Sequence, residues 1–344
     1  MKILLITDYL SPQTHGIALR FEYYIKYIRQ FNHTIKIYGP PMSPSSTNKL
    51  WYFTNPWNPS NQICIPSCEL ICDVICNKYD VIHCVYPPSI PGFFILLLSF
   101  FIKLNIVTSN HINLHYYGSI YGLSFLYYFI KYLIYAPQYY FAKKILSPST
   151  LEDLQMSYNI NTDIIHTGVD DTIFSPVIKP RKNTLLYVGR FSPEKNLKKL
   201  IDIIPSNYTL QLVGYGLYYD ELVAAAASKS NIVFVGKVEN KELYSYYQNA
   251  KAHITMSESE TFCLTLLESL SCGTPIIYAN CTVFNSLYKD DFPELMYNNN
   301  LEEILTYIDL NEIELQKRCV EYAKNHNWEN ATVKLLKTYE EASI

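Results

Sequence analysis

The stretch SESETFCLTLLESLSCGTP, residues 257–275, indicates how the second half of the chain folds. Residues 257–261 make an acidic loop rich in hydroxyl groups, and residues 264–272 make a short apolar run with helical character. Gly273 and Pro275 follow directly, and residues of these two types typically end a helix. The stretch therefore predicts a loop, then a short helix, then an abrupt stop.

A helix that begins here would offer a site for an anion. The backbone N–H groups near Phe262, Cys263 and Leu264 would be unpaired at its N-terminus, which carries about half a positive charge. Phosphate is the anion most often bound at a helix N-terminus. Glu260 and Glu268 repel phosphate, but their carboxylates accept hydrogen bonds from hydroxyl groups. A phosphate site flanked by two carboxylates that accept hydrogen bonds from hydroxyl groups suits a sugar nucleotide. The alternative is that residues 264–272 form a capped amphipathic helix without a ligand, beside a solvated loop that includes Thr261.

The spacing Glu-x7-Glu, followed by Gly-x-Pro, resembles the signature of family 4 retaining glycosyltransferases, which have the GT-B fold. The resemblance implies that Glu260 contacts the donor sugar and that Glu268 holds the ribose of the nucleotide. Family members often have glycine at the position of Cys263. The resemblance is nearest to the sulfoquinovosyltransferase-like and glycolipid branch of the family.

A second motif follows the predicted strand at residues 184–188. Gly189-Arg190-Phe-Ser-Pro-Glu-Lys195-Asn is similar to the family's phosphate-binding pair. Arg190 could bind a diphosphate with two parallel hydrogen bonds, and Lys195 could bind it as a point charge. The alternative is that Arg190 caps the strand and that Lys195 pairs with Glu194 in solvent.

Two further strand ends offer binding positions. Gly214 follows the predicted strand at residues 209–213, and glycine lets a backbone come close to a ligand. Lys237 and Val238 follow the strand at residues 232–235, and the resemblance implies that this turn lines the base pocket. Glycines at strand ends are also common in ordinary turns, which is the alternative for both positions.

The first half supplies three candidates by resemblance. Gly16 begins a helix where the family has glycines close to the phosphate and the reacting sugar carbon. His111 follows the strand at residues 105–109, where the family often has a histidine beside the donor sugar. We expect His111 to be a polar contact and not a free general base. Arg20 is similar to the sulfoquinovosyltransferase-like branch; it could meet an anionic group or be a surface arginine.

Strand-like runs alternate with helical runs along the whole chain, which favours parallel sheets with helix crossovers. We predict an α/β GT-B fold of two Rossmann-like doubly wound domains facing across a cleft. Residues 1–173 would form the acceptor domain, residues 174–326 the nucleotide-sugar domain, and residues 327–344 a helix packing back on the first domain. Residues 39–60 are predicted to be a loop. The predicted strands are residues 2–7, 33–38, 80–84, 105–109, 144–147, 163–166, 184–188, 209–213, 232–235, 253–256 and 275–278.

The composition excludes several classes of protein. Among 344 residues the net charge is −3, which gives no broad basic surface for nucleic acid. Apolar residues make up 49%, enough for full cores and too many for a disordered chain. No basic segment with a cleavage site precedes the first apolar run, so we expect no secretion signal. The nine cysteines are an odd number, and we expect a reducing cytoplasm.

Two features leave alternatives open. Cys64, Cys68, Cys72 and Cys76 recur every four residues; we expect small buried apolar residues, with a metal site as the alternative. Residues 90–104 and 116–141 are apolar, but the first is short for a membrane span and the second contains glycine, lysine and proline. The second is expected to be either a buried helix or an interfacial helix that gives peripheral membrane contact.

No Asp-x-Asp pair suited to a divalent metal is present, so we predict metal-independent transfer without a cofactor. The expected catalytic residues are His111, Glu260, Arg190 and Lys195. The expected reaction moves a hexose, with retention of configuration, from a nucleoside diphosphate sugar, preferably UDP-linked, to a lipid or glycan acceptor. Two alternatives are a sugar-nucleotide epimerase and a non-catalytic subunit that binds nucleotide sugars.

Overall fold

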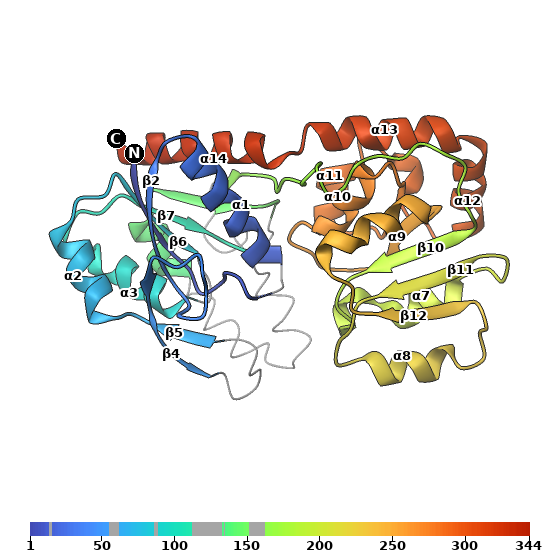
Figure 1. Ribbon diagram of the computed structural model, residues 1–344, viewed down its shortest axis with the longest axis horizontal. Coiled ribbons are helices and arrows are strands. Elements are labelled where there is room, and N and C mark those ends of the chain that lie inside the picture. The colour runs from blue at the N-terminus through green and yellow to red at the C-terminus, as the bar shows by residue number, and fades with distance from the viewer. Residues whose placement is uncertain (14–15, 55–61, 86–88, 112–132, 134, 151–161) are drawn as a thin grey trace. The chain divides into compact units, whose positions relative to one another are not determined.

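The computed structural model describes every residue except 14–15, 55–61, 86–88, 112–132, 134 and 151–161. The chain divides into two compact units. Residues Met1–Thr167 and Trp328–Ile344 form the first unit, and Gly168–Asn327 form the second. Each unit has a parallel sheet with helices on both faces (Figure 1). The expected α/β class with two Rossmann-like halves is confirmed.

The first unit has a seven-stranded sheet in the order β3-β2-β1-β6-β7-β8-β9. All its strand pairs are parallel. The interior strands β6 and β7 are buried along their whole length because helices cover both faces, although β6 contains His83 and β7 ends in Thr108 and Ser109. The strands are β1 (Lys2–Ile6), β2 (Thr34–Gly39), β3 (Asn48–Lys49), β6 (Val81–Val85), β7 (Ile106–Ser109), β8 (Lys144–Ser147) and β9 (Asp163–Ile164).

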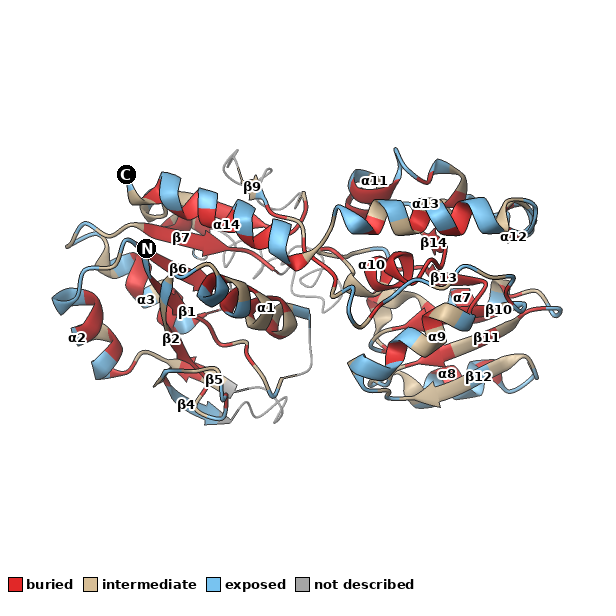
Figure 2. Cartoon of the chain, turned by 45° about the horizontal axis from the view of Figure 1, so that its top comes forward, coloured by how far each residue is buried: buried red, intermediate tan, exposed pale blue. Residues whose placement is uncertain are grey.

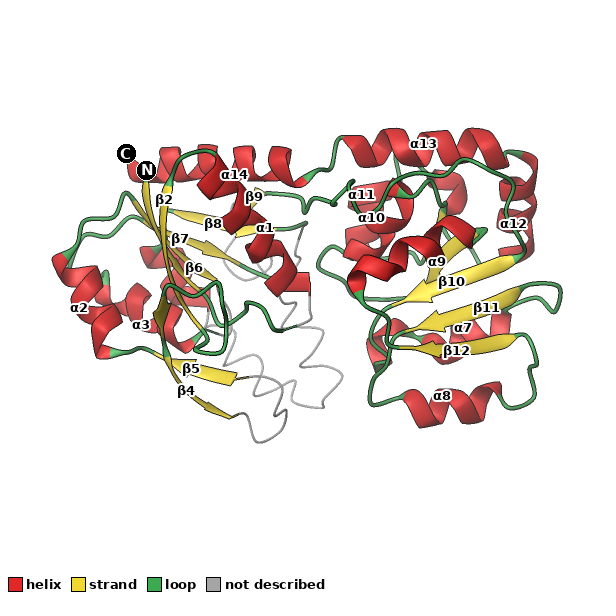
Figure 3. Cartoon of the chain, viewed as in Figure 1, coloured by secondary structure: helices red, strands yellow, loops and turns green. Residues whose placement is uncertain are grey.

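Four described helices of the first unit are α1 (Gly16–Gln30), α2 (Cys68–Cys76), α3 (Ile90–Leu98) and α14 (Trp328–Ser343). Alternate side chains of a strand point to opposite faces, so β1 serves two cores. Leu4 and Ile6 pack in one core with Leu70 of α2 and Ile95 of α3. On the other face, α14 lies beside α1 and contacts β6 and β7 (Figure 3). The C-terminal helix is thus part of the first unit.

The prediction of a loop over residues 39–60 is wrong in part. Besides β3, the segment contains β4 (Trp51–Thr54), which pairs antiparallel with β5 (Gln62–Ile65) in a two-stranded sheet. The sequence of β4, Trp-Tyr-Phe-Thr, has the aromatic and β-branched residues that favour strands. This short run was not predicted as a strand because the prolines and serines around it are typical of loops.

The expectation of buried cysteines is wrong for three of the four. Cys64 is buried on β5, but Cys68, Cys72 and Cys76 are exposed along α2. Helix α2 turns its leucine and valine side chains toward the core, so the four-residue cysteine spacing follows the solvent face. Across the described residues, no group of three or more His, Cys, Asp or Glu side chains is placed to hold a metal ion.

The second unit has a five-stranded sheet in the order β12-β11-β10-β13-β14. All five strands expected in this half are present, and all are parallel. Glycine follows or ends several of them, as the sequence indicated. The strands are β10 (Thr184–Val188), β11 (Thr209–Val213), β12 (Ile232–Gly236), β13 (Ala252–Thr255) and β14 (Ile276–Tyr278).

Helices α7 and α8 cover one face of this sheet, α9 and α10 cover the other, and α13 packs on α10 (Figure 3). Strands β10, β13 and β14 and helix α10 are largely buried, whereas the edge strand β12 has no buried residue (Figure 2). The α-helices are α7 (Leu197–Ile203), α8 (Tyr219–Ala226), α9 (Leu243–Asn249), α10 (Leu264–Ser271), α11 (Thr282–Tyr288), α12 (Leu301–Leu310) and α13 (Glu312–Lys324). Short 3₁₀ turns are η1 (Pro193–Lys195), η2 (Asn240–Glu242) and η3 (Pro293–Leu295).

The strand order of the second unit reverses between β10 and β13. From β10 the chain moves outward to β11 and β12, and it then returns to place β13 on the other side of β10. In doubly wound sheets, ligands bind outside the carboxyl ends of the strands at such a switch point. A ligand site is therefore expected at the loops that follow β10 and β13.

Neither apolar stretch forms a described membrane span. Residues 90–104 form α3 and the turn after it, and most of residues 116–141 lie outside the described part of the chain. Of the helices that the structure describes, none has the length and apolar character needed to cross a bilayer.

Candidate functional site

The loops after β10 and β13 meet at the switch point. β10 and β13 are hydrogen-bonded neighbours, so their carboxyl ends lie side by side. The backbone N–H of Glu258 donates to the carbonyl of Glu194 at 3.2 Å, and the Ser257 hydroxyl donates to the same carbonyl at 3.3 Å. Asn196 Nδ2 donates to Glu258 Oε1 at 3.0 Å. These bonds hold the two loops together.

Lys195 and Glu260 form an ion pair across the two loops. Lys195 Nζ lies 2.5 Å from Glu260 Oε1, and the two side chains are 16% and 13% exposed. Burial is the largest single influence and lowers the pKa of the Lys195 ammonium, but the charge and hydrogen bond of Glu260, together with the Tyr187 and Cys263 side chains, outweigh it and raise that pKa above its ordinary value. Lys195 is therefore a fixed cation at the carboxyl ends of the central strands.

Arg190 lies nearer to solvent and pairs with a different carboxylate. Its side chain is 64% exposed, and its Nη2 lies 3.2 Å from Oε1 of Glu194. Glu194 is itself buried and accepts a hydrogen bond from the Ser192 hydroxyl at 2.6 Å. Burial raises the pKa of Glu194, but the bond from Ser192 and the charges of Lys195 and Arg190 lower it more. The alternative pairing of Lys195 with Glu194 is wrong, because Arg190 takes that place.

Glycine is required at position 214 because this residue contacts the backbone of Gly189. A Cβ atom on Gly214 would lie 1.9 Å from the carbonyl oxygen of Gly189, and Gly214 has a φ of +136°. The ends of β10 and β11 can approach this closely only without that side chain. The sequence analysis predicted that Gly214 lets a ligand come close to the backbone. In the structure, Gly214 allows two backbone segments, the ends of β10 and β11, to come close to each other.

Helix α10 begins where the sequence predicted it. It starts at Leu264, directly after Cys263, and Phe262 is buried beneath the loop. Cys263 has a φ of +69°, a left-handed conformation that glycine adopts at less cost. Burial raises the pKa of the Cys263 thiol to about 12, so the thiol is neutral. The preceding residue Thr261 is half-buried at the edge of the same loop.

Glu268 lies in the interior on α10, with both carboxylate oxygens bonded. Oε2 accepts a hydrogen bond from the Tyr247 hydroxyl at 2.9 Å, and Oε1 accepts one from Asn240 Nδ2 at 3.3 Å. Burial raises the pKa of Glu268 to about 7, although both bonds oppose this. Tyr247 and Asn240 were missed in the sequence. Their only sequence signal was that Asn240 follows closely on the strand-end turn at Lys237 and Val238.

The structure thus brings the predicted residues of the second unit together in two groups. Lys195, Glu260 and the start of α10 form one group at the switch point. Glu268 belongs to the other group, through Asn240, with the turn after β12. Lys237 is exposed and Val238 half-buried in that turn, which begins at Gly236 with a φ of +86°.

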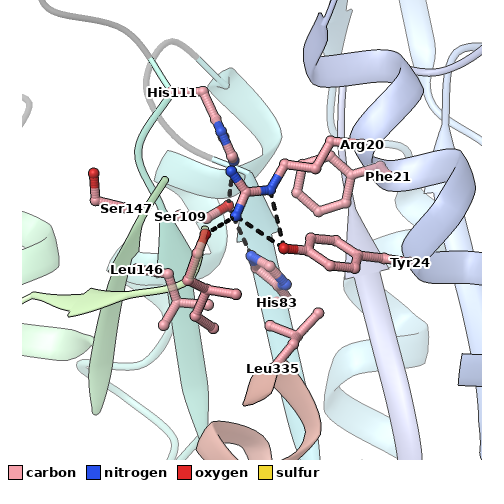
Figure 4. A pocket seen from close by; sticks show the side chains of 10 residues that line it. Arg20, Phe21, Tyr24, His83, Ser109, His111, Leu146, Ser147 and Leu335 are labelled. Carbon is pink, nitrogen blue, oxygen red and sulfur yellow. Dashed lines mark hydrogen bonds between the residues drawn. The ribbon is translucent and has the colours of Figure 1, made fainter. Parts of the chain in front are cut away.

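The predicted residues of the first unit have different surroundings. Gly16 is the exposed first residue of α1, and the residue before it lies outside the described part. His111 is buried, with Nε2 3.1 Å from the Ser109 hydroxyl. Arg20 is only 5% exposed, so the alternative of a surface arginine is wrong. It donates to the Tyr24 hydroxyl at 2.8 and 3.1 Å and borders a small cavity with His111 (Figure 4).

The fold defines a class of protein: two Rossmann-like units of this topology are the architecture of GT-B glycosyltransferases. The sucrose-phosphate synthase of Thermosynechococcus elongatus has this fold, with a TM-score of 0.75 and 18% identity, over 99% of this chain and 98% of that one. The Anabaena protein HepE, solved in complex with UDP and glucose, matches with a TM-score of 0.72 and 16% identity, over 99% and 100%. At these identities the likeness shows the fold alone.

The second unit can be assigned to a family. Residues 169–326 match the family described as glycosyl transferases group 1, so this part of the chain is a domain of that family. The match confirms the predicted enzyme class, glycosyltransferase, for this domain.

Two relatives of known name are also sugar-transferring enzymes by name. An alpha-monoglucosyldiacylglycerol synthase of Streptococcus pneumoniae is 29% identical over 211 residues, 52% of this chain and 48% of that protein. A sulfoquinovosyl transferase of Arabidopsis thaliana is 23% identical over 376 residues, 96% of this chain and 71% of that protein. The chain spans about half the length of the first of these relatives.

Proposed function

We propose that the protein transfers a hexose from a nucleoside diphosphate sugar, UDP-linked by preference, to a lipid or glycan acceptor. The observation that carries this proposal is the position of Lys195. Its cation lies at the topological switch point, beside the N-terminus of α10, in a domain of the glycosyl transferases group 1 family.

The chemistry follows from the charge that the reaction creates. Breaking the bond between sugar and phosphate leaves positive charge on the sugar and negative charge on the nucleoside diphosphate. Lys195, Arg190 and the first N–H groups of α10 can stabilise that negative charge, and preorganised charge is usually the largest contribution to catalysis. These groups would do the work of a divalent cation, so we propose a metal-independent reaction that needs no cofactor.

The two carboxylates have separate proposed roles. Glu260 is assigned to the donor sugar; its bond to Lys195 supports this role, because Lys195 is proposed to bind the adjoining diphosphate. Glu268 accepts a hydrogen bond from a ribose hydroxyl. Because Asn240 and Tyr247 already hold both Glu268 oxygens, the ribose would use the lone pairs that these residues leave.

The stereochemistry and the acceptor rest on resemblance. Membership of the family 4 branch would mean retention of configuration, with the leaving phosphate taking the proton of the acceptor. One named relative is a synthase whose name denotes a glycolipid, which favours a lipid acceptor. For the remaining roles, the resemblance assigns Lys237 and Val238 to the base pocket, and Gly214 would allow a close approach of backbone to ligand. The resemblance assigns Gly16 to the phosphate and the reacting sugar carbon, and His111 to a polar contact with the donor sugar.

We also propose peripheral contact of the first unit with an anionic membrane. Five aromatic side chains on and near α3 and before β8 are largely exposed: Phe94, Phe100, Phe101, Tyr139 and Tyr140. Lys103 and Lys143 are exposed beside them, and residues 81–151 contain no aspartate or glutamate. Aromatic rings with lysines and no acidic groups suit an interface with anionic lipid.

The test is an assay of nucleotide release from a panel of UDP- and GDP-sugars, with lipid and glycan extracts as acceptors. The proposal expects UDP release that depends on an acceptor and persists in a chelator. An isomerised donor formed without acceptor would identify an epimerase. Donor binding without any turnover would identify a non-catalytic subunit, and either result would overturn the proposal.

A further inference from the structure

The first unit has a topological switch point of its own. From β1 the chain moves outward to β2 and β3, and it later returns to place β6 on the other side of β1. Ligands of doubly wound sheets bind outside the carboxyl ends of the strands at such a point. Asp8 lies just after β1, and Ser89 lies after β6 as the N-cap of α3. The Ser89 hydroxyl donates to Asp8 Oδ1 at 3.3 Å, so the two loops meet at these residues.

The Asp8 carboxyl is buried and poorly bonded. The residue is 7% exposed, and the bond from Ser89 is long for a hydroxyl donor. Among the described residues, no hydrogen bond reaches Asp8 Oδ2. An ionised carboxyl can accept about four hydrogen bonds. Burial therefore raises the pKa of Asp8 to about 7, and the bond from Ser89 lowers it only in part.

Asp73 of α2 is a buried carboxyl of the same unit with different surroundings. It is 8% exposed, and Lys36 Nζ lies 2.8 Å from its Oδ2. The Tyr79 hydroxyl donates to the same oxygen at 2.7 Å. Burial raises the pKa of Asp73, but these partners outweigh it and lower that pKa below its ordinary value. The two aspartates thus differ in their partners. A buried carboxyl with as few partners as Asp8, at a switch point, is a candidate ligand site.

The surroundings of Asp8 favour a neutral ligand. Asp8 is not needed to cap α3, because Ser89 Oγ already accepts the capping bond from the backbone N–H of Gly92 at 3.2 Å. A cation suits the place poorly, because the helix N-terminus is itself partly positive. The charge of Asp8 acts on the Tyr9 hydroxyl and the Cys64 thiol, and burial raises the pKa of both, so both are neutral. A hydroxyl group that donates to Oδ2 fits these surroundings.

We propose that Asp8 binds a hydroxyl group of the acceptor, at a site formed by the loop after β1 and the N-terminus of α3. The hydroxyl donates to Asp8 Oδ2 and supplies a bond that the described residues do not make. A lipid alcohol and a sugar offer the same donor group. This inference deepens the proposed function, on which it rests for the identity of the ligand as an acceptor. The site is made by side chains of the first unit alone.

The direct test follows the protonation of Asp8 in the full chain by infrared difference spectroscopy, with Asp8→Asn identifying its band. One arm adds diacylglycerol in micelles of a detergent without hydroxyl groups, and the other adds methyl glucoside. A hydroxyl that donates to the ionised carboxyl should lower its pKa by about 1, so the arm that does this identifies a lipid or a glycan acceptor. Empty micelles give the baseline. A pKa of Asp8 that moves in neither arm would overturn the inference.

Kinetics give a second readout. Asp8→Asn keeps the shape of the side chain but replaces a charge-assisted bond with a neutral one, so KM for the acceptor should rise about tenfold. KM for the donor should change less than about twofold. Urea unfolding at about pH 8 should show no loss of stability, because the substitution removes a buried and poorly bonded charge.

Asp73→Asn is the matched control. Asp73 is as buried as Asp8 but is paired with Lys36, so this variant should lose stability and keep its KM for the acceptor. A rise of the acceptor KM in both variants, or in neither, would overturn the inference. If diacylglycerol or methyl glucoside lowers the pKa of Asp8 but no donor is turned over, the hydroxyl site stands and the proposed transferase function fails. If turnover depends on the acceptor but Asp8→Asn keeps the unaltered KM, the function stands and the site fails.

Discussion

Lys195 Nζ and Glu260 Oε1 lie 2.5 Å apart although 65 residues separate them in the chain. They come from the loops after β10 and β13, the two neighbouring strands at which the sheet order reverses. In the free protein, the cation proposed to bind the diphosphate is thus held by the carboxylate proposed to contact the sugar. An incoming diphosphate would share this lysine with Glu260, without a large movement of either loop.

Lys195→Ala should lower kcat/KM about 100-fold or more, because it removes a charge that stabilises the leaving diphosphate. It should also destabilise the fold by about 2 kcal/mol, because it leaves the largely buried Glu260 without its cation. Steady-state kinetics and urea unfolding measure the two effects. Lys198→Ala is the control, since Lys198 pairs with Glu221 in solvent. Equal kinetic losses in both variants would contradict the role of Lys195.

Arg190→Ala should separate binding from stability. The side chain is mostly exposed, so the free energy of unfolding should change by less than about 0.5 kcal/mol. Loss of a charge-assisted bond to phosphate, about 1.5–3 kcal/mol, should raise KM for the donor roughly tenfold to a hundredfold. The rise should be smaller at high salt, because salt screens an exposed charge. An unchanged KM at low salt would remove Arg190 from the site.

Glu268 should make stability depend on pH. Its pKa is about 7 in the folded protein and has an ordinary value of 4.5. The folded state therefore binds more protons than the unfolded state between these values, and the free energy of unfolding falls as pH rises from 4.5 through 7. The loss should be about 3 kcal/mol. In Glu268→Gln this fall should be absent, so parallel stability curves for the two proteins would contradict the assignment.

Gly214→Ala should destabilise the second unit by about 3 kcal/mol or more. The new Cβ would meet the Gly189 carbonyl at 1.9 Å, and this backbone atom cannot move aside. Gly236→Ala is the control. It also has a positive φ but meets nothing within 4 Å, so it should cost only about 1–2 kcal/mol of backbone strain. Chemical unfolding of the two variants should rank them in this order.

Binding to lipid vesicles tests the aromatic surface of the first unit. Phe100 and Phe101 are 71% and 79% exposed, and replacing both with serine should reduce sedimentation with anionic vesicles at least about tenfold. Leu217→Ser is the control, because Leu217 is 99% exposed but belongs to the second unit. Vesicle binding that survives the double substitution, or that ignores lipid charge, would refute the proposed contact.

The sequence predicted best where the determinants of structure are local. All five strands of the second unit and helix α10 were predicted within a residue or two, because each is a short apolar run, and a glycine ends or follows three of the strands. The short strand β4 was missed since its aromatic run is surrounded by turn residues. The exposed cysteines of α2 were misjudged because a four-residue spacing fits either face of a helix.

By itself, the sequence determined the α/β class, the strands of the second unit and the residues Arg190, Lys195, Glu260 and Glu268 as candidates. Only the tertiary structure decided their partners. It paired Lys195 with Glu260 and Arg190 with Glu194, and it buried Glu268 against Asn240 and Tyr247. The physical reason is that hydrophobic periodicity reports which face of an element is buried. Which distant element covers that face depends on strand order and crossovers, and these are properties of the whole fold.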